Sequence, residues 1–87
     1  MIIASAIKYY IDETDSEVIL CGRRHGDVIK QLPILGFKPQ QGYKELAQGF
    51  VDDRGEFLTR EEAYEHAVSC SQISPKDSKE LFSEDLW

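Results

Sequence analysis

Two arginines and a histidine stand together at Arg23-Arg24-His25, in a chain whose formal net charge is -6. Guanidinium groups bind phosphates and carboxylates through paired hydrogen bonds, and the start of a helix adds unpaired N–H groups. Gly26 would let the backbone approach a bound molecule closely. The cluster therefore predicts an anion site; the alternative is a solvated strand end whose arginines pair with carboxylates such as Asp27. Strand alternation predicts Arg23 and His25 on one face and Arg24 on the other.

Three residues elsewhere in the chain are candidates for the same site. Arg60 opens a predicted helix and could reach an anion or a partner carboxylate. The amide of Gln48 could read the edge of a nucleobase, although a surface strand residue is the simpler interpretation. Tyr43, in a polar stretch, is the best candidate for stacking on an aromatic ring. Tyr9 and Tyr10 could also stack, but alternating aromatic residues are more typical of a core.

Metal and catalytic motifs are not found. Cys21 and Cys70 lie far apart among apolar neighbours, so we expect two buried, reduced thiols. His25 and His66 lack metal-ligand spacing, and residues 52–56 lack the carboxylates of a calcium loop, so neither a metal nor a cofactor is predicted. One enzyme hypothesis stays open, in which His25 hydrolyses a nucleotide by general acid–base catalysis.

Composition limits the class of protein. The chain has 87 residues, with 16 acidic and 10 basic side chains, which predicts one domain over residues 1–87. The negative charge disfavours direct binding to nucleic acid or to an anionic membrane. No apolar run is long enough to span a bilayer and no signal peptide is recognised, so we expect a cytoplasmic protein.

Hydrophobic periodicity predicts an α+β domain of order β-β-α-β-β-α with antiparallel hairpins. The predicted elements are strands at 2–11, 17–21, 47–52 and 56–58, and helices starting at 26 and running over 60–71. Pro33 should kink or stop the first helix, and Gly36 should cap it. Thr59 and Glu62 form a capping-box pattern at the start of the second helix. Residues 38–44 are expected to form a loop.

The last part of the chain, residues 71–87, reads as a polar linker followed by an apolar tail. Its large apolar residues are Leu81, Phe82, Leu86 and Trp87. Burying each would stabilise the protein by roughly 1.5–3 kcal/mol, so the tail should dock on the body of the protein or on a partner.

Five segments resemble a group of short proteins encoded by phages and prophages. They are Ser5-Ala6-Ile7-Lys8, Gly22-Arg23-Arg24-His25, Gln48-Gly49-Phe50-Val51, Phe57-Leu58-Thr59-Arg60-Glu61-Glu62-Ala63 and Leu81-Phe82-Ser83-Glu84-Asp85-Leu86-Trp87. The resemblance covers most of the chain. Small phage proteins include sponges, which sequester nucleotide signals of bacterial defence systems such as the NAD-derived signals of Thoeris. The resemblance implies a similar role as a candidate.

The leading hypothesis is an anti-defence protein that binds a small anionic, nucleotide-type ligand without converting it. The expected ligand-binding residues are Arg23, Arg24, His25, Tyr43, Gln48 and Arg60. A chain this short encloses a ligand more easily at a subunit interface, which predicts a homodimer or larger assembly. The alternative is an inhibitor of a host factor that acts through its acidic surface and its C-terminal tail.

Overall fold

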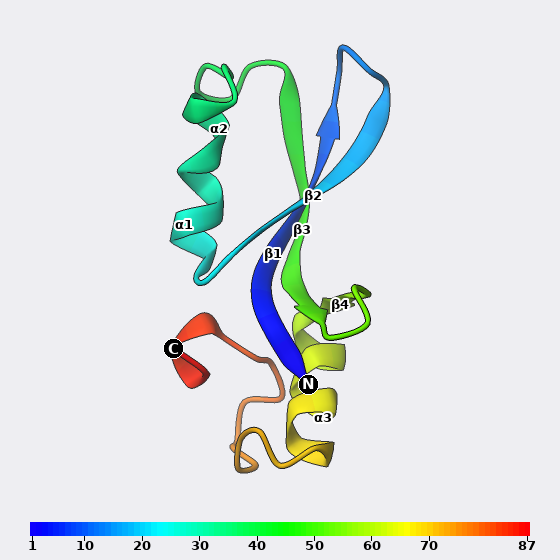
Figure 1. The fold of residues 1–87 in the computed structure, drawn as a ribbon, viewed down its shortest axis with the longest axis vertical. Helices are drawn as coiled ribbons and strands as arrows, with labels where there is room; N and C mark the ends of the chain where they lie inside the picture. The colour runs from blue at the N-terminus through cyan, green and yellow to red at the C-terminus, as the bar shows by residue number, and fades with distance from the viewer.

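A four-stranded antiparallel sheet forms the centre of the molecule in the computed structural model, which describes residues 1–87. The strands are β1 (Ile2–Ile11), β2 (Ser16–Gly22), β3 (Tyr43–Asp52) and β4 (Phe57–Thr59), in the sheet order β2-β1-β3-β4 (Figure 1). The helices are α1 (His25–Ile29), α2 (Gln31–Ile34) and α3 (Arg60–Ser69), followed by one 3-10 turn, η1 (Ser83–Asp85). The predicted α+β class and order of elements are confirmed.

The long strands β1 and β3 set the shape of the sheet. Ile7, Tyr9 and Ile11 are buried on one face of β1, as their alternation predicts. β3 begins at Tyr43, so the predicted loop over 38–44 is wrong at its last two residues. The polar start of β3 is a strand because it pairs with β1 as far as the Ile11–Tyr43 pair. Backbone pairing here overrides the local side-chain composition.

The first helical region is broken into α1 and α2 at Lys30. Pro33 has no N–H to donate to the carbonyl of Ile29, which explains the break that the sequence predicted. Gly36 has a φ of +97°, and the N–H of Phe37 donates to the carbonyl oxygen of Leu32 at 3.0 Å. This is the predicted glycine cap, since the left-handed conformation favours glycine.

The predicted capping box opens α3. The N–H of Thr59 donates to the Glu62 carboxylate at 2.9 Å, and the N–H of Glu62 donates to the Thr59 hydroxyl at 3.2 Å. The helix ends at Ser69, two residues before the predicted end, and buries Ala63, Tyr64 and Ala67 against the sheet.

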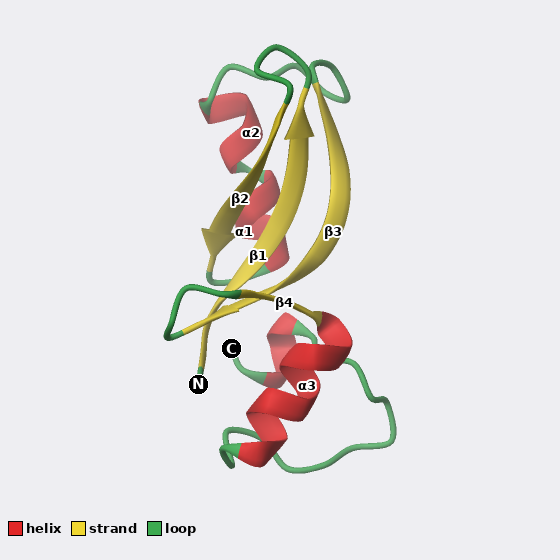
Figure 2. Cartoon of the chain, turned by 90° about the vertical axis from the view of Figure 1, so that its right-hand side faces the viewer, coloured by secondary structure: helices red, strands yellow, loops and turns green.

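All three helices cover the same face of the sheet. Phe50 pairs with Ser5 and therefore shares the face of Ile7. One apolar cluster lies under α1 and α2, around Ile7, Tyr9, Ile11, Val28 and Leu32. The other lies under α3, around Ile2, Phe50, Ala63, Tyr64, Ala67 and Leu81. Figure 2 shows α1 and α2 beside the upper part of the sheet and α3 at its lower end. The His25 ring, at the start of α1, packs against Phe50 of the second cluster in a T-shaped arrangement, at a centroid distance of 5.1 Å.

The C-terminal tail docks on the body of its own chain. Leu81 is 0% exposed, and its N–H donates to the carbonyl oxygen of Arg60 at 3.0 Å. Leu86 and Trp87 pack against the same cluster and are half-buried. The prediction of a docking tail is thereby confirmed, with α3 and the sheet as the surface that receives it.

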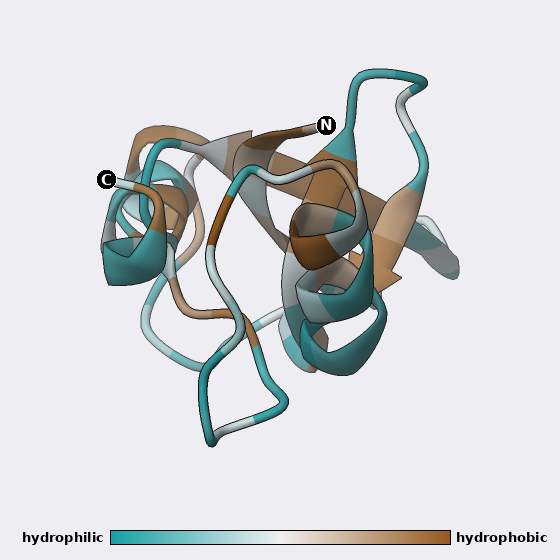
Figure 3. Cartoon of the chain, turned by 90° about the horizontal axis from the view of Figure 1, so that it is seen from below, coloured by the Kyte–Doolittle hydropathy of each residue, from teal (hydrophilic) through white to brown (hydrophobic).

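Both cysteines are exposed, so the prediction of buried thiols is wrong. On β2, Val18 and Leu20 point toward the helices, which turns Cys21 to the uncovered face of the sheet. Cys70 is the C-cap residue of α3 and follows the part of the helix that packs on the sheet. Figure 3 shows hydrophobic segments mainly in the strands, and hydrophilic residues on the helices as well as in the outer loops. No helix has the length and apolar character needed to cross a membrane.

Candidate functional site

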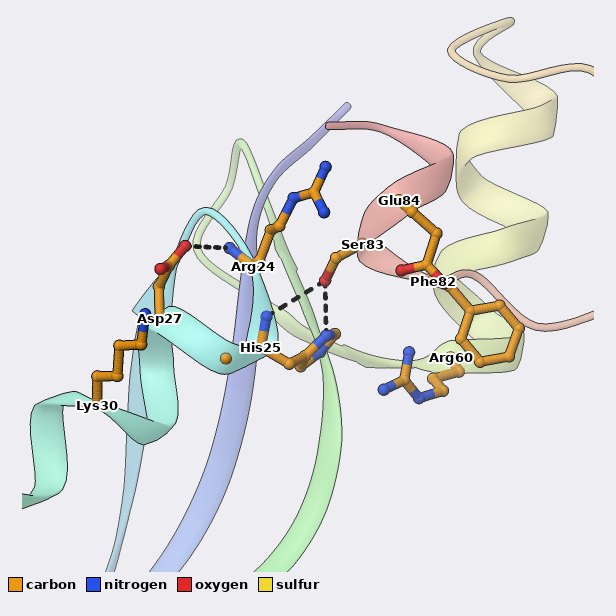
Figure 4. A pocket seen from close by; sticks show the side chains of 9 residues that line it. Arg24, His25, Asp27, Lys30, Arg60, Phe82, Ser83 and Glu84 are labelled. Atoms are coloured by element: carbon orange, nitrogen blue, oxygen red, sulfur yellow. Dashed lines mark hydrogen bonds between the residues drawn. The ribbon is translucent and has the colours of Figure 1, made fainter.

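An open hollow of about 410 Å³ lies where α1, the first residue of α3 and the tail meet. This junction hollow is lined by Arg24, His25, Gly26, Asp27, Lys30, Arg60, Phe82, Ser83 and Glu84. Figure 4 shows the α1 residues on one side and the tail residues on the other, with Arg60 beneath Phe82. The site therefore depends on segments that are far apart in the sequence.

His25 fixes the wall of the junction hollow through both of its ring nitrogens. Nε2 donates to the carbonyl oxygen of Gly49 at 2.8 Å, because a carbonyl can only accept. The remaining nitrogen, Nδ1, lies 2.7 Å from the Ser83 hydroxyl and accepts from it in the neutral ring. Burial lowers the pKa of His25; the Gly49 carbonyl opposes this shift and the charge of Arg60 adds to it. The neutral form therefore dominates near pH 7.

A short chain of hydroxyl groups extends from His25 toward β1. The Ser83 hydroxyl lies 2.7 Å from the Ser5 hydroxyl, and the Ser5 oxygen lies 3.0 Å from the carbonyl oxygen of Arg23. Because Ser83 donates to His25, the single proton of Ser5 serves these two acceptors. The main-chain N–H of His25 also donates to Ser83, at 3.3 Å. Ser83 is only 5% exposed, so these contacts hold the tail in a fixed position against α1 and β1.

Arg60 joins α3 to the tail and to β3. Its guanidinium donates to the carbonyl oxygen of Leu81 at 2.9 Å and to the amide oxygen of Gln48 at 2.6 Å. The same group lies 4.9 Å from the centre of the Phe82 ring, in cation–π contact. These contacts hold the charge of Arg60 at the edge of the junction hollow.

Arg24 and Lys30 bring two more positive charges to the junction hollow. Arg24 donates to the main-chain oxygen of Trp87, while Lys30 makes no ion pair or hydrogen bond through its ammonium group. With Arg60 there are three cations against the two carboxylates of Asp27 and Glu84, so the side chains that line the hollow sum to +1 when His25 is neutral. In a chain of net charge -6, this hollow is a local region that favours anions.

The predicted site residues are only partly brought together. Arg24, His25 and Arg60 converge on the junction hollow, and Gln48 lies beside it through its bond to Arg60. Arg23 is exposed and does not line the hollow. The predicted strand alternation of Arg23, Arg24 and His25 is wrong because β2 ends at Gly22, and the chain bends before α1.

Tyr43 belongs to a second hollow, of about 440 Å³, farther along β3. This β3 hollow is lined by Tyr9, Ile29, Leu32, Gln40, Tyr43, Lys44 and Glu45. The Tyr43 ring makes edge contacts with Tyr9 and with Phe37, each at a centroid distance of 5.6 Å. Its hydroxyl accepts from the N–H of Gln40 at 3.1 Å. Tyr43 is therefore a half-buried, fixed ring rather than the exposed loop residue that its polar neighbours predicted.

Sequence reasoning missed four residues of the junction hollow, which are Lys30, Phe82, Ser83 and Glu84. Lys30 follows Gly26 by four positions, and this helical spacing places both on one side of α1, so it could have been found. Phe82 and Ser83 carry no such signal, since their place depends on how the tail docks. Ser83 is the more informative of the two because it is the one tail residue that is hydrogen-bonded to His25.

One further cluster combines His66 with Asp52 and Asp53, whose ligand atoms lie within 4.8 Å of one another. Asp52 accepts from the N–H groups of Arg54 and Glu56, at 2.9 and 3.0 Å, and so closes the turn after β3. The N-terminal ammonium group lies 3.2 Å from Asp53 and 2.8 Å from Nε2 of His66. Protein groups thus engage all three side chains.

Comparison with known proteins gives one match over the whole chain. The family described as Phage T4 y16D protein matches residues 1–87. No curated protein and no solved structure shows significant similarity.

Proposed function

We propose, from the premise that the chain belongs to the Phage T4 y16D protein family, that this phage protein binds a small anionic, nucleotide-type ligand in the junction hollow. The observation that carries the proposal is the convergence of Arg24, Lys30 and Arg60 on one open hollow. Carboxylates dominate the chain as a whole, so this concentration of cations would provide local attraction for a phosphate group.

The arrangement favours binding over hydrolysis. Both ring nitrogens of His25 are engaged, one by Gly49 and the other by Ser83, which leaves no free nitrogen to accept a proton from a substrate. His25 instead positions the tail that forms one side of the junction hollow. A protein that only binds would suit a sponge, which keeps a nucleotide signal from a host defence effector.

The alternative of a host-factor inhibitor receives less support. That hypothesis uses the apolar tail as an anchor for a partner, but Leu81 is fully buried in the protein's own core. Leu86 and Trp87 also pack against that core. Only the acidic surface still supports the host-factor inhibitor hypothesis.

Ligand binding can be tested by native mass spectrometry of protein purified from cells rich in nucleotide signals, followed by titration with the nucleotide that is released. Lys30→Ala should weaken binding by about tenfold, the effect of losing one charge-assisted contact. Because the ammonium group of Lys30 makes no contact within the protein, the variant should fold normally.

Arg23→Ala is the matched control, because Arg23 is an exposed cation outside the junction hollow. Equal losses in the two variants would mean that only overall charge matters, and would refute the junction hollow as the site. Release of a converted product would favour an enzyme. Protein without any bound nucleotide would favour the host-factor inhibitor.

A further inference from the structure

We infer that the β3 hollow binds the base of the same ligand, and that Tyr9 and Glu45 read an adenine-type edge with an N–H donor beside a ring-nitrogen acceptor. This inference rests on the proposed function, because it assigns the second half of the nucleotide-type ligand. Four observations carry it: an unpartnered hydroxyl, a neighbouring carboxylate, apolar walls, and a connection to the junction hollow.

The Tyr9 hydroxyl is the unusual group of the β3 hollow. Tyr9 is only 1% exposed, yet its hydroxyl makes no hydrogen bond within the protein. Every fully covered side-chain oxygen in the structure has a partner, so the Tyr9 hydroxyl must open on the hollow. The hydroxyl of an otherwise buried tyrosine usually finds a partner. Here a bound molecule would supply it.

Glu45 provides the second polar group. Glu45 is the cross-strand partner of Tyr9 in the β1–β3 pair, so both side chains lie on the same face of the sheet. Burial raises the pKa of Tyr9, and the charge of Glu45 adds to this shift. At neutral pH the Tyr9 hydroxyl can donate, and the Glu45 carboxylate can only accept. The pair is complementary to an acceptor and a donor side by side. Adenine presents this pattern with a ring nitrogen and its amino group, whereas hypoxanthine presents the reverse pattern at the same positions.

The remaining walls of the β3 hollow suit a flat ring. Ile29 and Leu32 come from the helices, and the Tyr43 ring is held by its contacts with Tyr9 and Phe37. Ile29 is 46% exposed, so a bound base would cover apolar surface that now faces water. Aromatic and aliphatic walls with few polar groups are typical of small-molecule sites.

A chain of hydrogen bonds connects the two hollows. Arg60 donates to Gln48, and the Gln48 amide donates to Glu45 at 3.2 Å. Gln48 and Glu45 are three positions apart on β3, roughly 10 Å at about 3.3 Å per residue. That separation suits one nucleotide, with its phosphate near Arg60 and its base near Glu45. Gln48, singled out from the sequence as a base reader, instead lies between the two subsites.

The test is isothermal titration of the protein with adenosine, inosine and ribose 5-phosphate. Adenosine should bind at least about tenfold more tightly than inosine, because inosine would present a ring N–H to the Tyr9 hydroxyl in place of an acceptor and would face the Glu45 carboxylate with a carbonyl. Tyr9→Phe and Glu45→Ala should each reduce this preference by about tenfold. Tyr9→Phe should unfold at the same temperature as the wild type, since the hydroxyl makes no internal hydrogen bond.

Tyr10→Phe is the matched control, because its hydroxyl bonds to Asp15 in the hairpin turn, away from the hollow. It should retain the full preference. Equal affinity for adenosine and inosine, or no binding of either, overturns the inference, as does a preference that survives in Tyr9→Phe. Ribose 5-phosphate reports on the junction hollow separately. If ribose 5-phosphate binds but adenosine and inosine bind equally well, the proposed function stands and the base subsite is refuted. If ribose 5-phosphate does not bind but adenosine is preferred over inosine, the base subsite stands and the phosphate site in the junction hollow is refuted.

Discussion

His25 connects three parts of the chain that are distant in the sequence. Its ring donates to Gly49 on β3 and accepts from Ser83 in the tail, while its backbone begins α1. The neutral ring fits these partners, with one nitrogen donating and the other accepting. A second proton would place a positive charge on a partly buried ring near Arg60, so protonation should weaken the fold.

Stability should accordingly fall in mild acid. The pKa of His25 is lowered from its usual value of 6.5, mainly by burial. Below pH 6.5 the unfolded chain takes up a proton that the folded chain does not, so the free energy of unfolding decreases as the pH falls toward the lowered pKa. Above pH 6.5 the full contribution is present. Urea unfolding at several values between about pH 7 and pH 5 measures the slope.

His25→Gln should flatten this slope, and His66→Gln serves as the matched histidine control. The carboxyl groups with lowered pKa values, those of Asp52 and Asp85, start from 3.8, so their contribution is lost only in more acidic solution. A wild-type protein whose unfolding free energy is constant over this range would contradict the assigned role of His25.

The residues of the site show what the sequence can and cannot predict. Arg24, His25 and Arg60 were predicted because cations at the starts of helices stand out in an acidic chain. Ser83 was not predicted because a serine in an apolar tail carries no signal of its own; its position follows from packing between distant segments. Tyr9 was predicted as a core residue, and its ring is one, but the sequence cannot show that its hydroxyl lacks a partner.

At the scale of elements, Gly49 determines how closely β4 approaches β3. A Cβ atom at this position would lie 2.1 Å from the carbonyl oxygen of Leu58 and 2.8 Å from the Phe57 ring. We predict that Gly49→Ala destabilises the protein by about 1–3 kcal/mol or more, because backbone atoms must move apart. The shift would also displace the carbonyl that His25 contacts. Chemical denaturation measures the loss.

Gly26→Ala is the control for this substitution. Gly26 lies in α1, and no atom comes within 4 Å of an added Cβ. Alanine is favoured over glycine in a helix, by up to about 1 kcal/mol, so stability should be unchanged or increased. If both substitutions destabilise the protein equally, the close approach of β4 is not the cause.

The order of elements was predictable because local sequence signals mark most of the strands and helix ends. Alternation identified β1 and β2, Pro33 and Gly36 ended the first helical region, and Thr59 with Glu62 began α3. The early start of β3 was not predictable, since residues 43–46 become a strand only by pairing with β1. The exposure of Cys21 was missed for a related reason: apolar neighbours in sequence do not show which face of a strand is covered.

At the scale of the whole molecule, the proposed ligand binding leads to a prediction about the oligomeric state. The molecule is elongated, about 40 × 21 × 20 Å, and both hollows are open. Ile29 at the end of α1, Ile34 at the end of α2 and Leu35 just after α2 are 46%, 83% and 58% exposed. We predict a homodimer or larger assembly that encloses the ligand and covers this apolar surface. Sedimentation velocity with and without ligand measures the oligomeric state. A monomer under both conditions would contradict the prediction, and Ile34→Asp should favour the monomer.

The docked tail also has a consequence for the timing of synthesis. The ribosome makes Arg24, His25 and Arg60 before it makes Phe82 and Ser83, yet the junction hollow needs both groups. A nascent chain that still holds residue 83 inside the ribosome can form the sheet and α1 but cannot close the hollow. Under the proposed function, ligand binding would therefore begin only after translation has passed the tail, and incomplete translation products would not compete for the ligand.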